Sequence, residues 1–277
     1  TDRWLWNTGF HFGEWLIPGQ PSEGLEVCKE SAGYIAPFFG YRTLCLFAEI
    51  CFLLNRAEYS EYSDYAEHMK QAIVDGILVP GHLPKHLMGA YVLAFAFGLV
   101  PEALYPQFTA QLRTLLDDAD DCVGTGFLAT PFLLDVAEAL YGAEAALRIL
   151  MQTKQPSWLF EVEQGATAIW ENWFAFSEQG EPQKCSFDHY AFGCVDDWLC
   201  RRLCGIDAAK PGFSELRIAP LANVPFDWTR TFVCEAGEIA VRKNGASLQV
   251  RIPPNTTAEV LWNAAAHNIG SGAYTFC

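Results

Sequence analysis

Residues 30 to 203 alternate between apolar stretches with helical spacing and short loops, and this alternation limits the folds open to the chain. Apolar side chains that recur at helical spacing predict helices that are amphipathic or fully buried. Short loops make consecutive helices antiparallel, and such hairpins stack side by side into toroids. The predicted helices cover residues 30–56, 59–76, 85–99, 102–118, 132–140 and 143–153, and a further helix is capped by Ser186 and ended by Gly205.

The composition changes after residue 207. Short runs with β-branched or alternating residues follow, separated by Gly, Pro and Asn, which is typical of short strands. These runs cover residues 216–219, 232–234, 238–243, 247–252 and 257–262. We therefore expect two domains, a helical domain at 1–207 and a small antiparallel β domain at 208–277.

The charge of the chain narrows the choice of partners. The 277 residues carry a formal charge of −15 and contain no cluster of Lys or Arg. This balance argues against binding to nucleic acid or to an anionic membrane. We also expect no apolar run of transmembrane length and no signal peptide, so the sequence predicts no membrane association. The chain opens at Thr1 and not at Met, which leaves open a leader that has been lost.

Ten cysteines are many for a chain of this length, but no CxxC pair occurs among them. Most of them lie within apolar segments, which favours buried free thiols in a reducing compartment and hence a cytoplasmic location. Cys200 and Cys204 lie four residues apart on a predicted helix. Since no His or Cys lies at ligand spacing from them, we assign them to the core and not to a metal site.

The stretch from Pro156 to Trp173 is the strongest candidate for a functional site. One acid, Glu171, lies between two indoles, Trp170 and Trp173. Indole faces offer a flat apolar surface to the C–H face of a sugar ring, and a carboxylate beside them can hold a water or a hydroxyl group. The alternative is a structural acid at a helix start with both indoles in the core.

The N-terminal loop is a second candidate. Glycines bracket aromatic residues and an acid between Gly9 and Trp15, and a Pro/Gly-rich segment follows at residues 17–24. Such a loop can place the side chains of Glu14 and Trp15 over a cleft. The alternative is a loop that only packs its aromatic rings.

Five segments of the chain together carry a resemblance to a known family. They are the Gly13-Glu14-Trp15 loop, residues 124–131, residues 156–173, residues 187–193, which read Phe-Asp-His-Tyr-Ala-Phe-Gly, and the Pro211-Gly212-Phe213 turn. In this order, the segments resemble the C-terminal part of the α-L-rhamnosidase family of inverting glycoside hydrolases. The resemblance implies an (α/α)6-toroid catalytic domain followed by a β-sandwich.

The resemblance also implies roles for individual residues. Glu171 would be the general base, and His189, within a helical turn, would hydrogen-bond the substrate. Trp15 would form a wall of the sugar pocket, and Glu14, where the family more often has Asp, would contact a sugar hydroxyl. Inversion needs two carboxyl groups roughly 6.5 to 9.5 Å apart. No metal or organic cofactor is implied, because water, a base and an acid suffice.

One expected segment is absent from the sequence. The family carries its general acid in an Asp-Glu-Arg segment ahead of the part resembled here, and this chain contains none. We count about seven helices before the β domain, whereas a closed toroid of six hairpins needs about twelve. The resemblance therefore implies a toroid that is incomplete at its N-terminus. An open apolar side would favour association, with a second copy or with the missing N-terminal part.

Three functions stay open at this point. The first is hydrolysis of a terminal α-linked L-rhamnose, or a related deoxysugar, by inversion. The second is another toroid activity such as hydrolysis of unsaturated uronides, for which the motif loops lack the expected basic residue. The third is a non-catalytic or degenerate carbohydrate-binding fragment without the general acid. The exact sugar, the linkage, the aglycone and the oligomeric state do not follow from the sequence.

Overall fold

The computed structural model describes residues 4–19, 25–177 and 179–277, so that part of the predicted Pro/Gly-rich segment at 17–24 lies outside the described residues. The chain divides into two compact units, one ending at Gly193 and the other beginning at Cys194. The predicted domain boundary at 207 stays a prediction.

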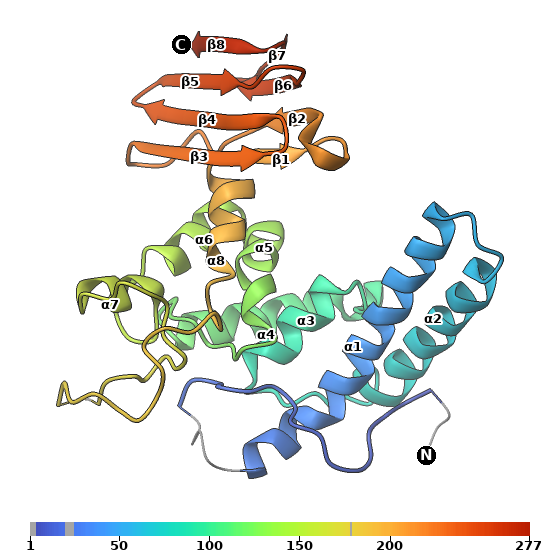
Figure 1. Cartoon of the computed structure of the whole chain (residues 1–277). Coiled ribbons are helices and arrows are strands. Elements are labelled where there is room, and N and C mark those ends of the chain that lie inside the picture. The colour runs from blue at the N-terminus through green and yellow to red at the C-terminus, as the bar shows by residue number, and fades with distance from the viewer. Residues whose placement is uncertain (1–3, 20–24, 178) are drawn as a thin grey trace. The chain divides into compact units, whose positions relative to one another are not determined.

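The first unit consists of helices that pair with their neighbours along the chain. α1 packs against α2, α3 against α4, and α5 against α6, as antiparallel hairpins with short loops (Figure 1). The helices are α1 (Leu25–Leu53), α2 (Tyr59–Ile73), α3 (Met88–Ala96), α4 (Tyr105–Asp118), α5 (Thr130–Tyr141), α6 (Ala143–Leu150) and α7 (Trp158–Glu163). A π-helical turn, Val74–Leu78, continues α2, and a 3₁₀ turn, Glu102–Leu104, precedes α4. The predicted hairpins are thus present, with ends that differ by a few residues.

α3 lies at the centre of this unit. Seven consecutive residues from Met88 to Ala94 are buried, so the helix has no exposed face along this run. It packs against α1, α4 and α5. Its neighbour α4 is instead amphipathic and buries Phe108, Leu112 and Leu116, which recur every four residues on one face. The hairpins therefore have an inner, apolar helix and an outer helix with a solvated face.

α1 departs from one expectation. Its stretch Lys29–Leu53 is long and apolar enough to cross a membrane by length and composition, so the expectation that no apolar run reaches that length is wrong. Core helices of water-soluble proteins meet the same criterion. Only 28% of the most apolar window is buried, although α1 packs against α2 and α3. Large apolar side chains near its C-terminal end are exposed, namely Leu46, Phe47, Ile50, Phe52, Leu53 and Leu54.

The described residues of 164–193, which are all but position 178, form no helix and no sheet strand, so the predicted helix does not begin at Ser186. The helix starts only at Val195, after Cys194. The main-chain N–H groups of Ser186 and His189 donate to the side chain of Glu171 and to the carbonyl of Ile169. Because these donors bind a neighbouring segment, the chain from Ser186 to His189 runs as a loop.

The second unit opens with α8 (Val195–Trp198), which continues as a π-helical turn, Leu199–Leu203. Eight strands follow: β1 (Ile206–Ala208), β2 (Glu215–Ile218), β3 (Trp228–Cys234), β4 (Gly237–Asn244), β5 (Ser247–Ile252), β6 (Thr257–Trp262), β7 (Ala265–Ile269) and β8 (Gly272–Phe276). They form two four-stranded sheets, β1-β2-β6-β7 and β3-β4-β5-β8 (Figure 1). Neighbouring strands are antiparallel except β2 and β6, which pair in parallel.

The core of this unit lies between the two sheets. Burial alternates along β5 and β6, as expected for strands with one face inward. Val241 and Val250 come from one sheet, Ile218 and Val260 from the other, and all four are at most 2% exposed. The predicted β domain therefore has the two-layered core of a sandwich.

The nine cysteines with described side chains form no disulfide. Cys51, Cys122 and Cys204 are buried, whereas Cys277 is exposed and the other five are partly exposed. The expectation of free thiols agrees with the described residues, but burial holds for only three of them. Cys204 belongs to the core as predicted, and Cys200 is partly exposed.

Candidate functional site

Two loop segments run side by side around the candidate base. The N–H of Glu171 donates to the carbonyl of Ser186 over 2.9 Å, and the N–H of His189 donates to the carbonyl of Ile169 over 2.8 Å. The fold thus brings Glu171 and His189, eighteen residues apart in the sequence, onto neighbouring segments of the first unit.

The Glu171 carboxyl is half-buried and oriented by one hydrogen bond. Its Oε2 accepts the N–H of Ser186 over 2.8 Å. The structure gives Oε1 no hydrogen-bond partner among the described residues. A carboxylate held through one oxygen, with the other unpaired and partial access to solvent, has the geometry needed to accept a proton from a water.

His189 is partly exposed and lies in a turn. Its Nδ1 accepts the N–H of Ala191 over 3.0 Å, which assigns the proton of the neutral ring to Nε2. The imidazole stacks on the ring of Tyr190, with centroids 5.0 Å apart. The predicted helical turn is absent here, because the helix begins further along the chain, at Val195.

Both indoles beside Glu171 lie in the core. Trp170 is 3% exposed and packs against Phe176 and Phe187. Trp173 is fully buried, stacks on Phe192 at a centroid distance of 4.1 Å, and donates its Nε1–H to a main-chain carbonyl. Neither ring has an exposed face for a sugar. The structural alternative for these two residues fits the described geometry better than a direct sugar contact.

Glu14 is buried and joins three segments. Its Oε1 accepts the N–H of Gly126 over 2.8 Å, and its Oε2 accepts the hydroxyl of Tyr34 over 3.1 Å. Its own N–H donates to the Oγ of Ser31 over 2.8 Å. The N-terminal loop, α1 and the loop before α5 are thus tied together by one residue. With 1% exposure, the Glu14 side chain offers no surface to a sugar.

Burial raises the pKa of Glu14 to about 7, against the lowering effect of hydrogen bonds from Gly126, Tyr34 and Ala129. Burial and the charge of Glu14 raise the pKa of Tyr34 well above its ordinary value, so the phenol stays a donor. Near neutral pH the Glu14 carboxyl is therefore divided between its neutral and its ionised form.

Two glycines make room for the Glu14 carboxyl. A Cβ at Gly89 in α3 would lie 2.1 Å from Oε2 of Glu14. A Cβ at Gly126 would lie 2.4 Å from the carbonyl oxygen of Trp15 and 2.8 Å from Cγ of Glu14. Both positions require glycine because the acid and its loop approach the main chain closely.

Trp15 is partly exposed and belongs to a series of aromatic residues. Its carbonyl accepts the N–H of Phe127 over 2.7 Å, and its ring meets that of Phe12 edge to face. The ring of Phe127 contacts that of Tyr190 at 5.6 Å, and Tyr190 in turn stacks on His189. Phe12 is 61% exposed and Tyr190 77% exposed. We call these residues, Phe12, Trp15, Phe127, His189 and Tyr190, the aromatic ledge.

Phe12, Phe127 and Tyr190 were not predicted as site residues from the sequence. Tyr190 directly follows His189, and Phe127 lies within the glycine loop at residues 124–131. An aromatic residue in a loop without apolar periodicity indicates a surface position, and this signal could have identified both residues.

Glu161 is a second buried acid, and its burial was not predicted from the sequence. It lies in α7, is 2% exposed, and accepts the N–H of Trp170 through Oε2 over 3.2 Å. Burial raises its pKa to about 7, and the Trp170 hydrogen bond opposes that shift. Its position between Phe160 and Val162, within an apolar helix, is the sequence signal of a buried carboxyl.

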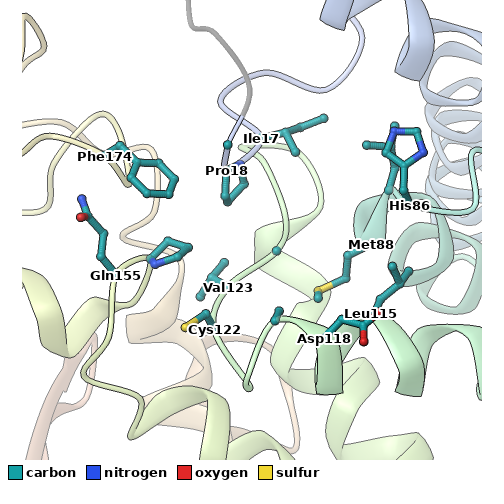
Figure 2. Close-up of a pocket in the computed structure, with 15 residues that line it drawn as sticks. Ile17, Pro18, His86, Met88, Leu115, Asp118, Cys122, Val123, Gln155 and Phe174 are labelled. Carbon is teal, nitrogen blue, oxygen red and sulfur yellow. The ribbon is translucent and has the colours of Figure 1, made fainter. Parts of the chain in front are cut away.

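A pocket of about 560 Å³ opens between the loops of the first unit. Figure 2 shows Phe174 and Gln155 on one side of it and His86, Met88 and Leu115 on the other. Its lining is mostly apolar. None of the six predicted site residues lines this pocket, so it is distinct from the surroundings of Glu171.

Two known protein families match successive parts of the chain. Residues 1–203 match the family described as the bacterial alpha-L-rhamnosidase 6 hairpin glycosidase domain. Residues 205–274 match the bacterial alpha-L-rhamnosidase C-terminal domain. The two matches together span nearly all of the chain.

Curated relatives agree with these matches. An alpha-L-rhamnosidase of Formosa agariphila is 30% identical over 260 residues, which is 90% of this chain and 28% of the relative. An alpha-L-rhamnosidase of Streptomyces avermitilis is 33% identical over 215 residues, which is 74% of this chain and 21% of the relative. The chain thus spans less than a third of the length of the curated relatives it matches.

Solved structures give the same picture of the fold. The Streptomyces avermitilis alpha-L-rhamnosidase complexed with L-rhamnose superposes with a TM-score of 0.85 at 27% identity, covering 99% of this chain and 29% of that one. The native enzyme from Aspergillus terreus superposes with a TM-score of 0.83 at 24% identity, covering 97% of this chain and 33% of that one. The expected class, hairpins of an α/α toroid followed by a β-sandwich, is confirmed.

Proposed function

The chain belongs to the bacterial alpha-L-rhamnosidase family, and from this premise we propose that its helical unit forms part of the site of a glycoside hydrolase that releases terminal α-L-rhamnose, or a related deoxysugar, by inversion. Glu171 is the general base in this proposal. The observation that carries it is the half-buried Glu171 carboxyl, oriented by the Ser186 N–H through Oε2, with Oε1 unpaired among the described residues. The unpaired oxygen accepts a proton from the attacking water.

The aromatic ledge takes the sugar in this proposal. His189 donates from Nε2 to a sugar hydroxyl, since its Nδ1 is already engaged by the Ala191 N–H. Trp15 and Tyr190 offer partly or largely exposed rings on which the C–H face of a sugar can lie. Carbohydrate is therefore the partner that the exposed side chains suit.

Three of the predicted site residues support the site from the core: Glu14, Trp170 and Trp173. Their side chains are at most 3% exposed, so we assign them the support of the surface residues in place of direct contact with the sugar. Trp173 donates to the carbonyl of Thr125, whose neighbour Gly126 donates to Glu14. The Glu171 loop and the N-terminal loop thereby share one set of buried hydrogen bonds.

The exposed end of α1 supports a proposal about partners. Phe52 is 63% exposed, Leu53 72% and Leu54 67%, which is unusual for large apolar side chains on a helix. We propose that this end is covered by further helices of the toroid in the complete enzyme, or by a second copy of the chain. Size measurements in solution distinguish the two, because only the second gives a dimer of this chain.

The test of the proposed base uses dinitrophenyl α-L-rhamnoside, whose leaving group departs without protonation and so needs no general acid. We expect slow hydrolysis by this chain and a loss of it in Glu171→Gln, while the exposed control Glu163→Gln keeps the parent rate. Proton NMR of the first product should give the β-anomer, as inversion requires.

Hydrolysis that survives in Glu171→Gln removes Glu171 from the role of base. The absence of turnover above buffer in a folded chain, together with binding of L-rhamnose in calorimetry, favours a carbohydrate-binding fragment that lacks the general acid.

A further inference from the structure

The carboxyl of Glu161 is held inside the first unit, below the loop that carries Glu171. It is 2% exposed, and its α-helix is capped by Ser157, whose Oγ accepts the N–H of Phe160 over 3.1 Å. Glu161 binds the following loop twice. Its carbonyl accepts the N–H of Ala166 over 3.0 Å, and its Oε2 accepts the N–H of Trp170 over 3.2 Å.

The second oxygen of this carboxyl has no partner. Oε1 of Glu161 is buried and makes no hydrogen bond with any of the described residues. An unpaired buried carboxylate oxygen is costly, and protonation relieves the cost. Buried acids whose oxygens serve only the fold usually have both of them satisfied, as Glu14 does. Glu161 therefore has a capacity for a proton that its structural contacts do not use.

The contact with Trp170 connects Glu161 to the proposed base. Trp170 directly precedes Glu171, so the hydrogen bond to the Trp170 amide fixes the main chain at which the base begins. On its other side Glu171 is fixed by Ser186, through both its N–H and its Oε2. Removal of the Glu161 contact would leave the base attached through the Ser186 side alone.

The thiol of Cys185 is affected by the charges of both acids. The pKa of the Cys185 thiol is raised, first by burial and then by the charges of Glu171 and Glu161. Cys185, which directly precedes Ser186, is thus close to both carboxyls.

We propose that Glu161 is a positioning residue for Glu171: its carboxyl accepts the Trp170 N–H and so holds in place the main chain directly ahead of the base. The proposal rests on the proposed function of Glu171. Glu161 itself is buried and touches no substrate, so it is not a catalytic residue.

The experiment compares three variants of the full chain. Glu161→Gln keeps an oxygen that can accept the Trp170 N–H but removes the titrating proton. Glu161→Met has a similar length and removes the acceptor as well. Glu163→Gln changes an exposed acid on the same short helix and is the matched control. Circular dichroism first establishes that each variant is folded.

Hydrogen exchange of residues 164–173 tests the holding role without any need for activity. We expect the Trp170 amide to exchange at least about tenfold faster in Glu161→Met, because a lost hydrogen bond of about 1.4 kcal/mol corresponds to a tenfold change. Glu161→Gln and Glu163→Gln should exchange as the parent does. Parent-like protection in a folded Glu161→Met overturns the holding role.

Hydrolysis of dinitrophenyl α-L-rhamnoside tests the link to the base. We expect kcat to fall by up to about 100-fold in Glu161→Met with KM nearly unchanged, since a small misplacement of a reacting group has this effect. Glu161→Gln, which keeps an acceptor for the Trp170 N–H, and Glu163→Gln should both retain the parent kcat. A parent-like kcat in a folded Glu161→Met overturns the role in positioning the base.

A parent without turnover defeats the proposed function but still decides this inference. Hydrogen exchange at the Trp170 amide then replaces kinetics, because it reports the Glu161 contact whether or not the chain is active. Faster exchange in Glu161→Met than in Glu161→Gln and Glu163→Gln supports the positioning role, and equal exchange in all three overturns it.

Discussion

Glu14 and Glu161 are both buried, and burial raises the pKa of each to about 7, yet their surroundings differ. Glu14 has a donor on each oxygen, and its partner Gly126 lies 112 residues further along the chain. Glu161 has a donor on one oxygen only, nine residues away. Burial raises the pKa of both acids. At Glu14 several hydrogen-bond donors oppose this rise, whereas at Glu161 a single donor opposes it.

The difference separates two uses of a buried carboxyl. The contacts of Glu14 are long-range and complete, so the residue joins parts of the toroid and stabilises the fold. The contacts of Glu161 are local and incomplete, so the residue acts on one loop. Substitutions in each region can show whether this division holds.

The largest effect is expected for Glu14→Ala. The substitution leaves the Gly126 N–H and the Tyr34 hydroxyl without acceptors inside the core and opens a cavity. We expect the free energy of unfolding to fall by about 4 kcal/mol. Urea denaturation followed by circular dichroism measures it. A loss below about 1 kcal/mol would mean that Glu14 does not join the segments energetically.

The next effect concerns the pH dependence of stability. Both carboxyls have a raised pKa in the folded chain, so the folded state binds protons more tightly than the unfolded state. The stabilisation is complete below the ordinary pKa of 4.5 and is lost as the pH rises towards 7. We expect about 3 kcal/mol for each acid over this range.

Variants assign this pH dependence to its sources. Glu14→Gln and Glu161→Gln should each remove about half of the slope between pH 4.5 and 7 in thermal melts, and Glu163→Gln none. A slope that is unchanged in both single variants would contradict the raised pKa values of the two acids.

Trp173→Phe tests the contact between the two regions. The change removes the hydrogen bond from Nε1 to the Thr125 carbonyl, which then keeps only the hydroxyl of Thr130 as a donor, at 3.3 Å. We expect a loss of about 1.5 kcal/mol in the free energy of unfolding. A double-mutant cycle with Glu14→Gln should reveal coupling, because Thr125 adjoins the Glu14 partner Gly126. Additive losses would mean that the two regions are independent.

The smallest effect is expected for Ser157→Ala at the cap of α7. The hydroxyl accepts the Phe160 N–H, so its loss should cost about 1 kcal/mol. Because α7 carries Glu161, hydrogen exchange should rise within residues 158–170 and remain unchanged around Glu14. A rise around Glu14 as well would show that α7 supports both regions equally.

The regular elements followed from the sequence because their patterns are local. β5 and β6 lie at the residues predicted from their alternation, and the helical hairpins follow from apolar spacing. β7 was missed because Ala265, Ala266 and Asn268 lack the β-branched character of a typical strand. Pairing with β6 supplies what the local sequence does not.

The site was only partly predictable, for a related reason. The order of the motif loops pointed to Glu171 and His189, which do lie on neighbouring segments. The burial of Glu14 and of both indoles depends on partners far away in the sequence, such as Gly126 for Glu14. The helix predicted from Ser186 is absent because the N–H groups of Ser186 and His189 donate to residues 171 and 169. The local sequence pattern gives no sign of these partners.

The parallel pairing of β2 with β6 fixes an order of events during synthesis on the ribosome. Arg217 pairs with Glu259, so the sheet that contains β2 cannot close until the chain has been made beyond β6. The hairpins of the first unit use partners close in sequence and can form earlier. Until then the edge of β2 that later pairs with β6 keeps its main-chain N–H and C=O groups without a strand partner.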